Sequence, residues 1–187
     1  MKARVFVLAA VLAATVSLSA QGSEPNESIR YSNVTEFGFV TASPQGVGLE
    51  ATTAHGISLN KQHHFGLGFG IGVSFRRNSN PNPVTYMPVF LNYRLYFRPE
   101  KTFSPHVNIS AGGIALEESV GGYASITMGF RAGKFSFSSG LSVMPIYREV
   151  ETVKYYDNPY GGSLSYSVYE EKWVYPFGIT LKWGFSF

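Results

Sequence analysis

Residues 65–75 read Phe-Gly-Leu-Gly-Phe-Gly-Ile-Gly-Val-Ser-Phe, and this stretch decides the fold of the chain. Its odd-numbered positions are all large and apolar, whereas its even-numbered positions are glycine or serine. Because successive side chains of a β-strand point to opposite faces, the stretch predicts a strand with one apolar and one almost bare face. A soluble sandwich would carry polar side chains on the second face. The pattern therefore favours the wall of a narrow barrel with lipid on its apolar side.

The same alternation recurs along the chain and predicts eight strands, each long enough to cross a bilayer when tilted. The expected strands are residues 31–42, 47–59, 65–75, 84–98, 106–117, 123–131, 135–147 and 173–187. Within 106–117 the apolar positions change parity at Gly112 and Gly113, which predicts a bulge there. We expect an all-β fold over residues 31–187, an eight-stranded antiparallel up-and-down transmembrane β-barrel.

Composition agrees with a membrane-facing wall and excludes several classes of function. The chain has 187 residues with 20 glycines, 15 phenylalanines and 12 tyrosines, and only 14% of its residues are charged. It has no cysteine, which excludes disulfides and thiolate metal sites. Lys2 and Arg4 lie in a segment expected to be removed, which leaves 13 of the 15 basic residues against 12 acidic ones. This balance gives no reason to expect a nucleic-acid partner.

Residues 1–20 are expected to form a cleaved signal peptide. Lys2 and Arg4 precede an apolar run over residues 5–18, and the small residues Ser19, Ala20 and Gly22 follow as candidate cleavage positions. The run is too short for a comfortable membrane-spanning helix, so a retained anchor is the weaker interpretation. Residues 21–30 are polar and unpatterned, and we expect them to form a short periplasmic leader.

The inward positions of the predicted barrel carry charges that need partners, because an isolated charge in a confined lumen is costly. These positions are Glu36, Glu50, Arg94, Arg98, Arg131 and Lys182. We expect Glu36 to pair with either Lys182 or Arg94. Large inward side chains on 84–98 should face a glycine-rich last strand across the lumen and fill it. The alternative is a water-filled interior without specific pairs. If the barrel forms a pore, the excess of positive charge among its inward side chains would favour anions.

The segment 149–172 is expected to be a long outer loop. Its arms flank a turn at residues 158–162 and could extend the seventh and eighth strands into a protruding hairpin. The loop is rich in tyrosine, at Tyr155, Tyr156, Tyr160, Tyr166 and Tyr169. Exposed tyrosines and unpaired strand edges suit contact with another protein. This segment therefore predicts a surface-interaction site for a protein partner.

No pattern in the chain indicates catalysis or metal binding. The four histidines, His55, His63, His64 and His106, map near the periplasmic end without the spacing or carboxylate partner of a metal site. No histidine falls in an outer loop, and the acidic residues of 149–172 are best interpreted as solvated loop charges. Asn33-Val34-Thr35 fits a glycosylation pattern but lies in a predicted strand. We expect no enzymatic activity, catalytic residue, metal or cofactor.

The end of the chain carries a family resemblance. Residues 179–187 read Ile-Thr-Leu-Lys-Trp-Gly-Phe-Ser-Phe, and with the signal peptide and eight amphipathic strands they resemble the small outer-membrane barrels of the OmpA/OmpX type. Residues 48–56 and 88–94 look more particularly like barrel proteins common in Bacteroidetes. The resemblance implies a place in the bacterial outer membrane, in contact with the lipid bilayer and lipopolysaccharide. It also implies that the barrel assembly machinery reads Leu181, Trp183, Phe185 and Phe187 as an assembly signal.

The resemblance implies structural, adhesive or small-pore roles. Together with the residues, it predicts an integral outer-membrane barrel with a structural or surface-interaction role and a largely side-chain-filled lumen. The alternative is a narrow passive channel for small solutes or ions. A soluble carrier with an apolar interior would reverse the two faces and expose glycines and serines to water, which is the weakest interpretation.

Overall fold

The computed structural model describes residues 29–44, 46–76, 83–116, 119–157 and 163–186. The expected signal peptide and most of the expected leader lie outside the described residues. The strands are β1 (Ile29–Ser43), β2 (Gly46–Leu59), β3 (His63–Arg76), β4 (Val84–Tyr96), β5 (Phe103–Leu116), β6 (Val120–Ala132), β7 (Phe135–Val143), β8 (Ile146–Asp157), β9 (Ser163–Val174) and β10 (Phe177–Ser186). Within the described part, no helix is long and apolar enough to cross a membrane.

Eight of these strands close into a barrel. β1 to β5 pair in sequence, β1 also pairs with β10, and β10 continues through β7 to β6. The pairing of β5 with β6 closes the ring, and every pair is antiparallel. The prediction of an all-β fold with an eight-stranded antiparallel up-and-down barrel is confirmed. Neighbouring strands of the wall are consecutive in the sequence, except that the first strand pairs with the last and that β7 pairs with β10 because β8 and β9 lie outside the ring.

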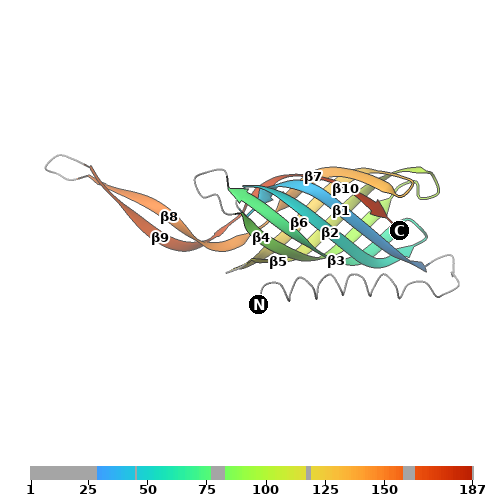
Figure 1. Ribbon diagram of the computed structural model, residues 1–187, viewed down its shortest axis with the longest axis horizontal. Coiled ribbons are helices and arrows are strands. Elements are labelled where there is room, and N and C mark those ends of the chain that lie inside the picture. The colour runs from blue at the N-terminus through green and yellow to red at the C-terminus, as the bar shows by residue number, and fades with distance from the viewer. Residues whose placement is uncertain (1–28, 45, 77–82, 117–118, 158–162, 187) are drawn as a thin grey trace.

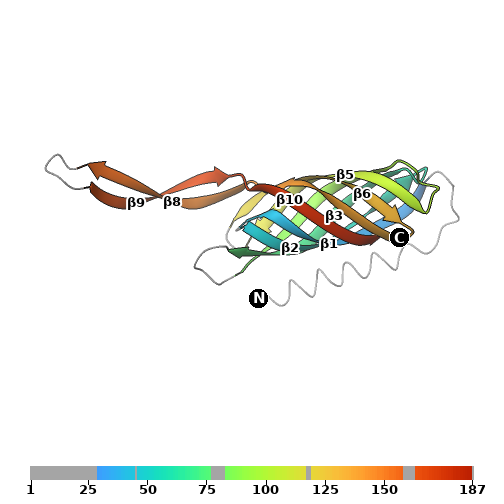
Figure 2. The same ribbon diagram turned by 90° about the horizontal axis from the view of Figure 1, so that it is seen from above.

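β8 and β9 form a two-stranded ribbon, residues 146–174, outside the barrel ring. They pair with each other from Ile146↔Val174 to Asp157↔Ser163, and β8 meets the barrel through Gly121↔Ile146. The ribbon projects along the barrel axis (Figures 1 and 2). We call this end of the barrel the ribbon end, and the opposite end, where β1 begins and β10 finishes, the terminal end.

The expected bounds of the seventh and eighth strands, 135–147 and 173–187, are wrong. β7 finishes at Val143 and β10 begins at Phe177, with Pro145 and Pro176 in the two gaps. Proline has no N–H group for a strand ladder, so it ends regular pairing at the barrel rim. The N–H of Met144 donates instead to the carbonyl of Pro176 at 3.0 Å.

The two faces of the barrel wall are as different as residues 65–75 predict. Phe65, Leu67 and Phe75 of β3 are exposed on the outer surface. On the inner side, a Cβ atom at Gly68 would collide with the Phe90 ring, and one at Gly72 with the Tyr86 ring. The glycines of β3 therefore make room for the large inward side chains of neighbouring β4. A carrier with an apolar interior and a polar outer face is contradicted.

β5 has no bulge at Gly112 and Gly113, so that prediction is wrong. Its pairing with β4 runs without a shift from Tyr86↔Leu116 to Tyr96↔His106, and its pairing with β6 is equally regular. Ile114 therefore stays on the inner face, where it is buried. The change of parity in the sequence marks an apolar layer inside the barrel and not a change of direction in the strand.

Candidate functional site

The lumen contains two buried ion pairs, and the first joins β1 to β4. Arg94 Nη2 lies 2.6 Å from Glu36 Oε1, and the Arg94 side chain is 1% exposed. Arg94 Nε also donates to Asn108 Oδ1 at 3.4 Å, and Asn92 donates to the same oxygen at 2.7 Å. Glu36 thus meets Arg94, one of the two partners that the sequence left open. This pair ties opposite sides of the wall together by charge-assisted hydrogen bonds.

The second pair lies nearer the ribbon end and is centred on Glu50 of β2. Lys182 Nζ on β10 lies 2.7 Å from Glu50 Oε1, and neither side chain is more than 5% exposed. The hydroxyls of Tyr123 and Tyr86 donate to the two carboxylate oxygens at 3.0 and 3.3 Å. Lys182 also donates to the Tyr123 hydroxyl at 3.0 Å. One carboxylate therefore links four strands, β2, β4, β6 and β10, across the lumen.

The lumen beyond the second pair is closed by apolar side chains. The buried cluster at the ribbon end comprises Val40, Ala42, Tyr86, Phe90, Ile114, Tyr123, Met144 and Ile146. The rings of Phe90 and Tyr123 are stacked with centroids 5.1 Å apart. Along the opposite wall, the hydroxyls of Ser125, Thr127, Ser136, Ser138, Ser142 and Thr180 have almost no accessible surface. These described side chains are buried inside the barrel, and the interior of an eight-stranded barrel is about wide enough for side chains to fill.

Two of the six expected lumen charges do not join these pairs. Arg98 is exposed, because β4 ends at Tyr96 and Arg98 falls in the connection to β5, where water can solvate it. Arg131 is half-buried at the terminal end, where its guanidinium lies 4.5 Å from the centroid of the Tyr96 ring and donates to the Pro99 carbonyl at 3.0 Å. The two ion pairs are each balanced, and of the six expected charges Arg131 is the inward positive charge that remains outside them.

The four histidines divide between the two faces of the barrel. His64 and His106 are buried inside, and the His106 ring lies 5.6 Å from that of Tyr96. His55 and His63 lie on the outer face, where the His63 ring stacks on those of Phe65 and Tyr93 and His63 Nδ1 is 2.9 Å from the Tyr93 hydroxyl. No group of three or more metal-ligating side chains is found among the described residues. The barrel wall thus separates the two pairs of histidines.

The residues expected to act in assembly lie on the outer face of the last strand. Leu181, Trp183 and Phe185 of β10 are exposed there, and Phe187 lies outside the described residues. Trp183 and Phe39 of β1 are in ring contact across the seam at 5.7 Å. These side chains are therefore accessible where the first and last strands meet.

The tyrosines expected to contact a partner are on the ribbon. Tyr155 and Tyr156 lie in β8, and Tyr166 and Tyr169 lie in β9. Tyr169 is exposed, whereas Tyr160 and the side chains of the other three lie outside the described part. The predicted hairpin arms are thus present as paired strands.

An outward polar cluster was missed by the sequence patterns. Tyr31, Asn33 and Thr35 of β1 alternate with inward side chains, and they lie beside Thr53 and His55 of β2. Tyr31 Oη lies 2.6 Å from His55 Nδ1, Asn33 Nδ2 lies 3.0 Å from the same nitrogen, and the two threonine hydroxyls lie 3.1 Å apart. The signal was available, because these odd-numbered positions interrupt the apolar row that Phe37 and Phe39 continue.

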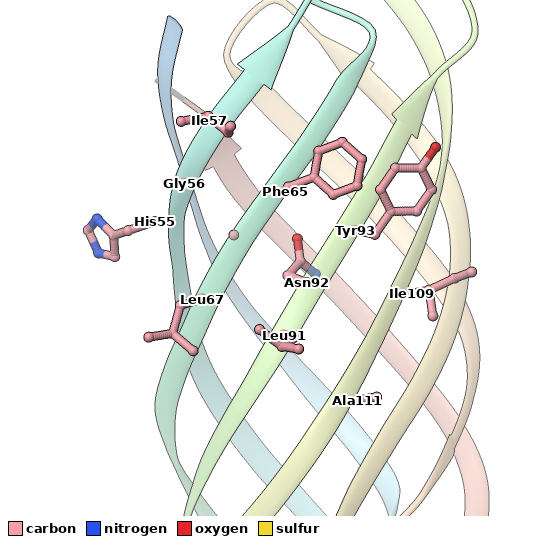
Figure 3. Close-up of a pocket in the computed structure, with 11 residues that line it drawn as sticks. His55, Gly56, Ile57, Phe65, Leu67, Leu91, Asn92, Tyr93, Ile109 and Ala111 are labelled. Carbon is pink, nitrogen blue, oxygen red and sulfur yellow. The ribbon is translucent and has the colours of Figure 1, made fainter. Parts of the chain in front are cut away.

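An outer groove of about 540 Å³ lies beside this cluster, over β2 to β5. Phe65 and Tyr93 form one side, with ring centroids 4.9 Å apart, and His55 belongs to both the groove and the polar cluster. Figure 3 shows Phe65 and Tyr93 side by side, with Leu67 and Leu91 further along the same two strands. Ala111 keeps the β5 side low because its side chain is a single methyl group. The groove is therefore an apolar hollow with hydrogen-bonding groups at one edge.

These features define a class of protein: a closed eight-stranded antiparallel β-barrel with an apolar outer face, buried ion pairs inside, and a projecting ribbon. No family model matches the chain. The comparison with curated proteins finds no match either. The case for a function therefore comes from the residues and their geometry.

Proposed function

We propose that the protein is an integral barrel of the bacterial outer membrane, which holds the ribbon at the membrane surface for contact with a protein partner. One observation supports this proposal above the others: the accessible face of the barrel is apolar and its enclosed face carries the charges. Large side chains such as Leu91 and Met128 are 69% and 66% exposed, whereas Glu50 and Arg94 are buried. In water such a surface would be strongly unfavourable, and in a bilayer it is the arrangement that lipid requires.

The proposal predicts that the barrel folds only in contact with an amphiphilic phase. Refolded with detergent micelles or phospholipid vesicles, the protein should migrate at one position on a gel without boiling and at another after boiling. A closed ladder of strand hydrogen bonds resists the gel detergent until heat breaks it. A protein that folds equally well in buffer without detergent and stays monomeric would exclude the membrane assignment.

The filled lumen supports an anchoring role over transport. The Glu50 and Glu36 pairs and the ribbon-end apolar cluster are buried at successive levels of the lumen. Ions crossing this lumen would have to break buried ion pairs. Breaking such a pair is costly, because it leaves a buried charge without its partner. The narrow channel remains the alternative function, and steady single-channel steps in a planar bilayer would favour it.

The ribbon is the part of the described chain best suited to contact a partner. Val153, Tyr169 and Trp173 are exposed on it. Among the described residues, β9 pairs with β8 alone, and β8 reaches the barrel at a single residue pair. Open strand edges beside exposed aromatic rings allow a partner to add a strand and to pack against the rings. We therefore assign the surface-interaction role to the ribbon.

Removing the ribbon should leave the barrel intact. Because Arg148 and Lys172 are direct partners, an Asn-Gly turn can replace residues 149–171 between them. We expect the shortened protein to keep its heat-dependent gel shift, with a free energy of unfolding changed by about 0.5 kcal/mol or less.

The shortened protein is also the matched control for binding assays. A partner held by the ribbon should bind the full chain and not the shortened one, with both proteins in the same vesicles. Loss of the gel shift on shortening would show instead that the ribbon supports the barrel.

A further inference from the structure

The outward polar cluster is out of place on a surface that the proposed function assigns to lipid. Its side chains interrupt the apolar rows of β1 and β2, and they bond mainly to one another. Asn33 Nδ2 also reaches Thr53 Oγ1 at 3.3 Å, and Thr35 donates to Asn33 at 3.2 Å. A self-contained network lowers the cost of polar groups beside hydrocarbon, but an apolar side chain would avoid that cost altogether. The cluster therefore indicates contact with a polar group at this position.

The apolar groove begins at the same residue. His55 is one of the residues that line the groove, and its ring nitrogens join the cluster. From His55 the groove extends over Leu67, Leu91 and Ile109 to Ala111. A ligand lying across both features would need a polar end for the cluster and a slender apolar part for the groove. An amphiphile with an acyl chain has that shape and that division of polarity.

We propose that this groove and the outward polar cluster form a binding site for one phospholipid of the surrounding membrane. The inference rests on the proposed membrane location and adds a specific lipid site to it. An acyl chain lies in the groove between the Phe65 and Tyr93 rings and the Leu67 and Leu91 side chains. The head-group and ester oxygens accept hydrogen bonds from the hydroxyls and amide of the cluster.

The chemistry of the cluster selects the kind of lipid. Besides the imidazole of His55, the cluster consists of three hydroxyl groups and one amide, and it contains neither lysine nor arginine. Recognition therefore depends on neutral hydrogen-bond donors, which suit the carbonyl and phosphate oxygens of a zwitterionic phospholipid. A polyanionic lipid would require the basic residues that the cluster lacks. Phosphatidylethanolamine is the probe that fits these groups.

A second copy of the chain is the competing occupant, and the groove argues against it. Ring and aliphatic side chains stand along its sides, while the small side chain of Ala111 keeps its β5 side low. A flat barrel wall of the same sequence would bridge such a hollow without filling it. A flexible acyl chain can follow it and contact both sides, which maximises the dispersion contacts.

The test is native mass spectrometry of the full chain released from phosphatidylethanolamine vesicles into a mild detergent. The unaltered protein should keep one bound lipid. Ala111→Trp fills the groove and His55→Leu removes the hydrogen-bonding centre of the cluster, and each should reduce lipid retention about tenfold. Met128→Trp is the matched control, because it adds the same ring at an exposed outward position on β6.

All variants are first shown to insert into vesicles by their heat-dependent gel shift, which separates the two proposals. Failure of the unaltered protein to insert would reject the membrane location and the lipid site with it. Insertion followed by equal lipid retention in all four proteins would reject the lipid site alone. A protein dimer that Ala111→Trp abolishes, without bound lipid in the unaltered protein, would assign the groove to a second copy and also overturn the inference.

Discussion

Replacing Glu50 with alanine is expected to lower the free energy of unfolding by about 3–5 kcal/mol, because it leaves a buried lysine without its counter-charge. Lys182 Nζ lies 2.7 Å from Glu50 and is almost fully buried, so water cannot replace the carboxylate without opening the lumen. Tyr86 and Tyr123 lose an acceptor in the same substitution. Urea titration in detergent micelles, followed by the heat-dependent gel shift and by tryptophan fluorescence, measures the loss.

Two comparisons make this result specific. Glu100→Ala removes the carboxylate of an exposed pair with Lys61, at 3.3 Å, and should change stability by less than about 1 kcal/mol. Adding Lys182→Met to Glu50→Ala removes the uncompensated charge and should recover much of the loss. Equal effects of Glu50→Ala and Glu100→Ala would show that the lumen is wet and that its pairs are weak.

Leu91→Arg should destabilise the barrel by about 2–4 kcal/mol in phospholipid vesicles, because it puts a charge on the face assigned to hydrocarbon. Leu91 lies in the middle of β4 and is exposed, so the substitution disturbs little packing in the protein itself. Val153→Arg is the matched control, since Val153 is exposed on the ribbon, away from the barrel wall. Urea titration in vesicles compares the two variants.

The outcome separates a lipid-facing wall from a water-facing one. In a bilayer, Leu91→Arg should cost far more than Val153→Arg. If both substitutions are neutral or improve solubility without detergent, the outer face contacts water and the membrane assignment is wrong. The outward rows of phenylalanine, leucine and tryptophan would then need a protein cover.

Much of the barrel could be predicted from alternation alone. In residues 65–75 the separation of large side chains from glycine is complete, and only a strand sorts residues in that way. The same logic identified the inward positions of Glu36, Glu50, Arg94 and Lys182. Pro145 and Pro176 follow the ends of β7 and β9, where the alternation continues but the missing N–H group ends the ladder. The parity change in β5 predicts a bulge only if every apolar residue faces outward, whereas Ile114 faces the lumen.

The sequence by itself determined the strand pattern, the number of barrel strands, and which face of the wall is apolar and which carries the charges. These properties depend on local alternation with a period of two residues. Only the tertiary structure decided which charges meet, since Glu50 and Lys182 are brought together by ring closure between the first and last strands. It also decided that Arg98 leaves the lumen and that His55 joins a groove to a polar cluster. These features depend on the register between strands distant in sequence, which a local pattern does not encode.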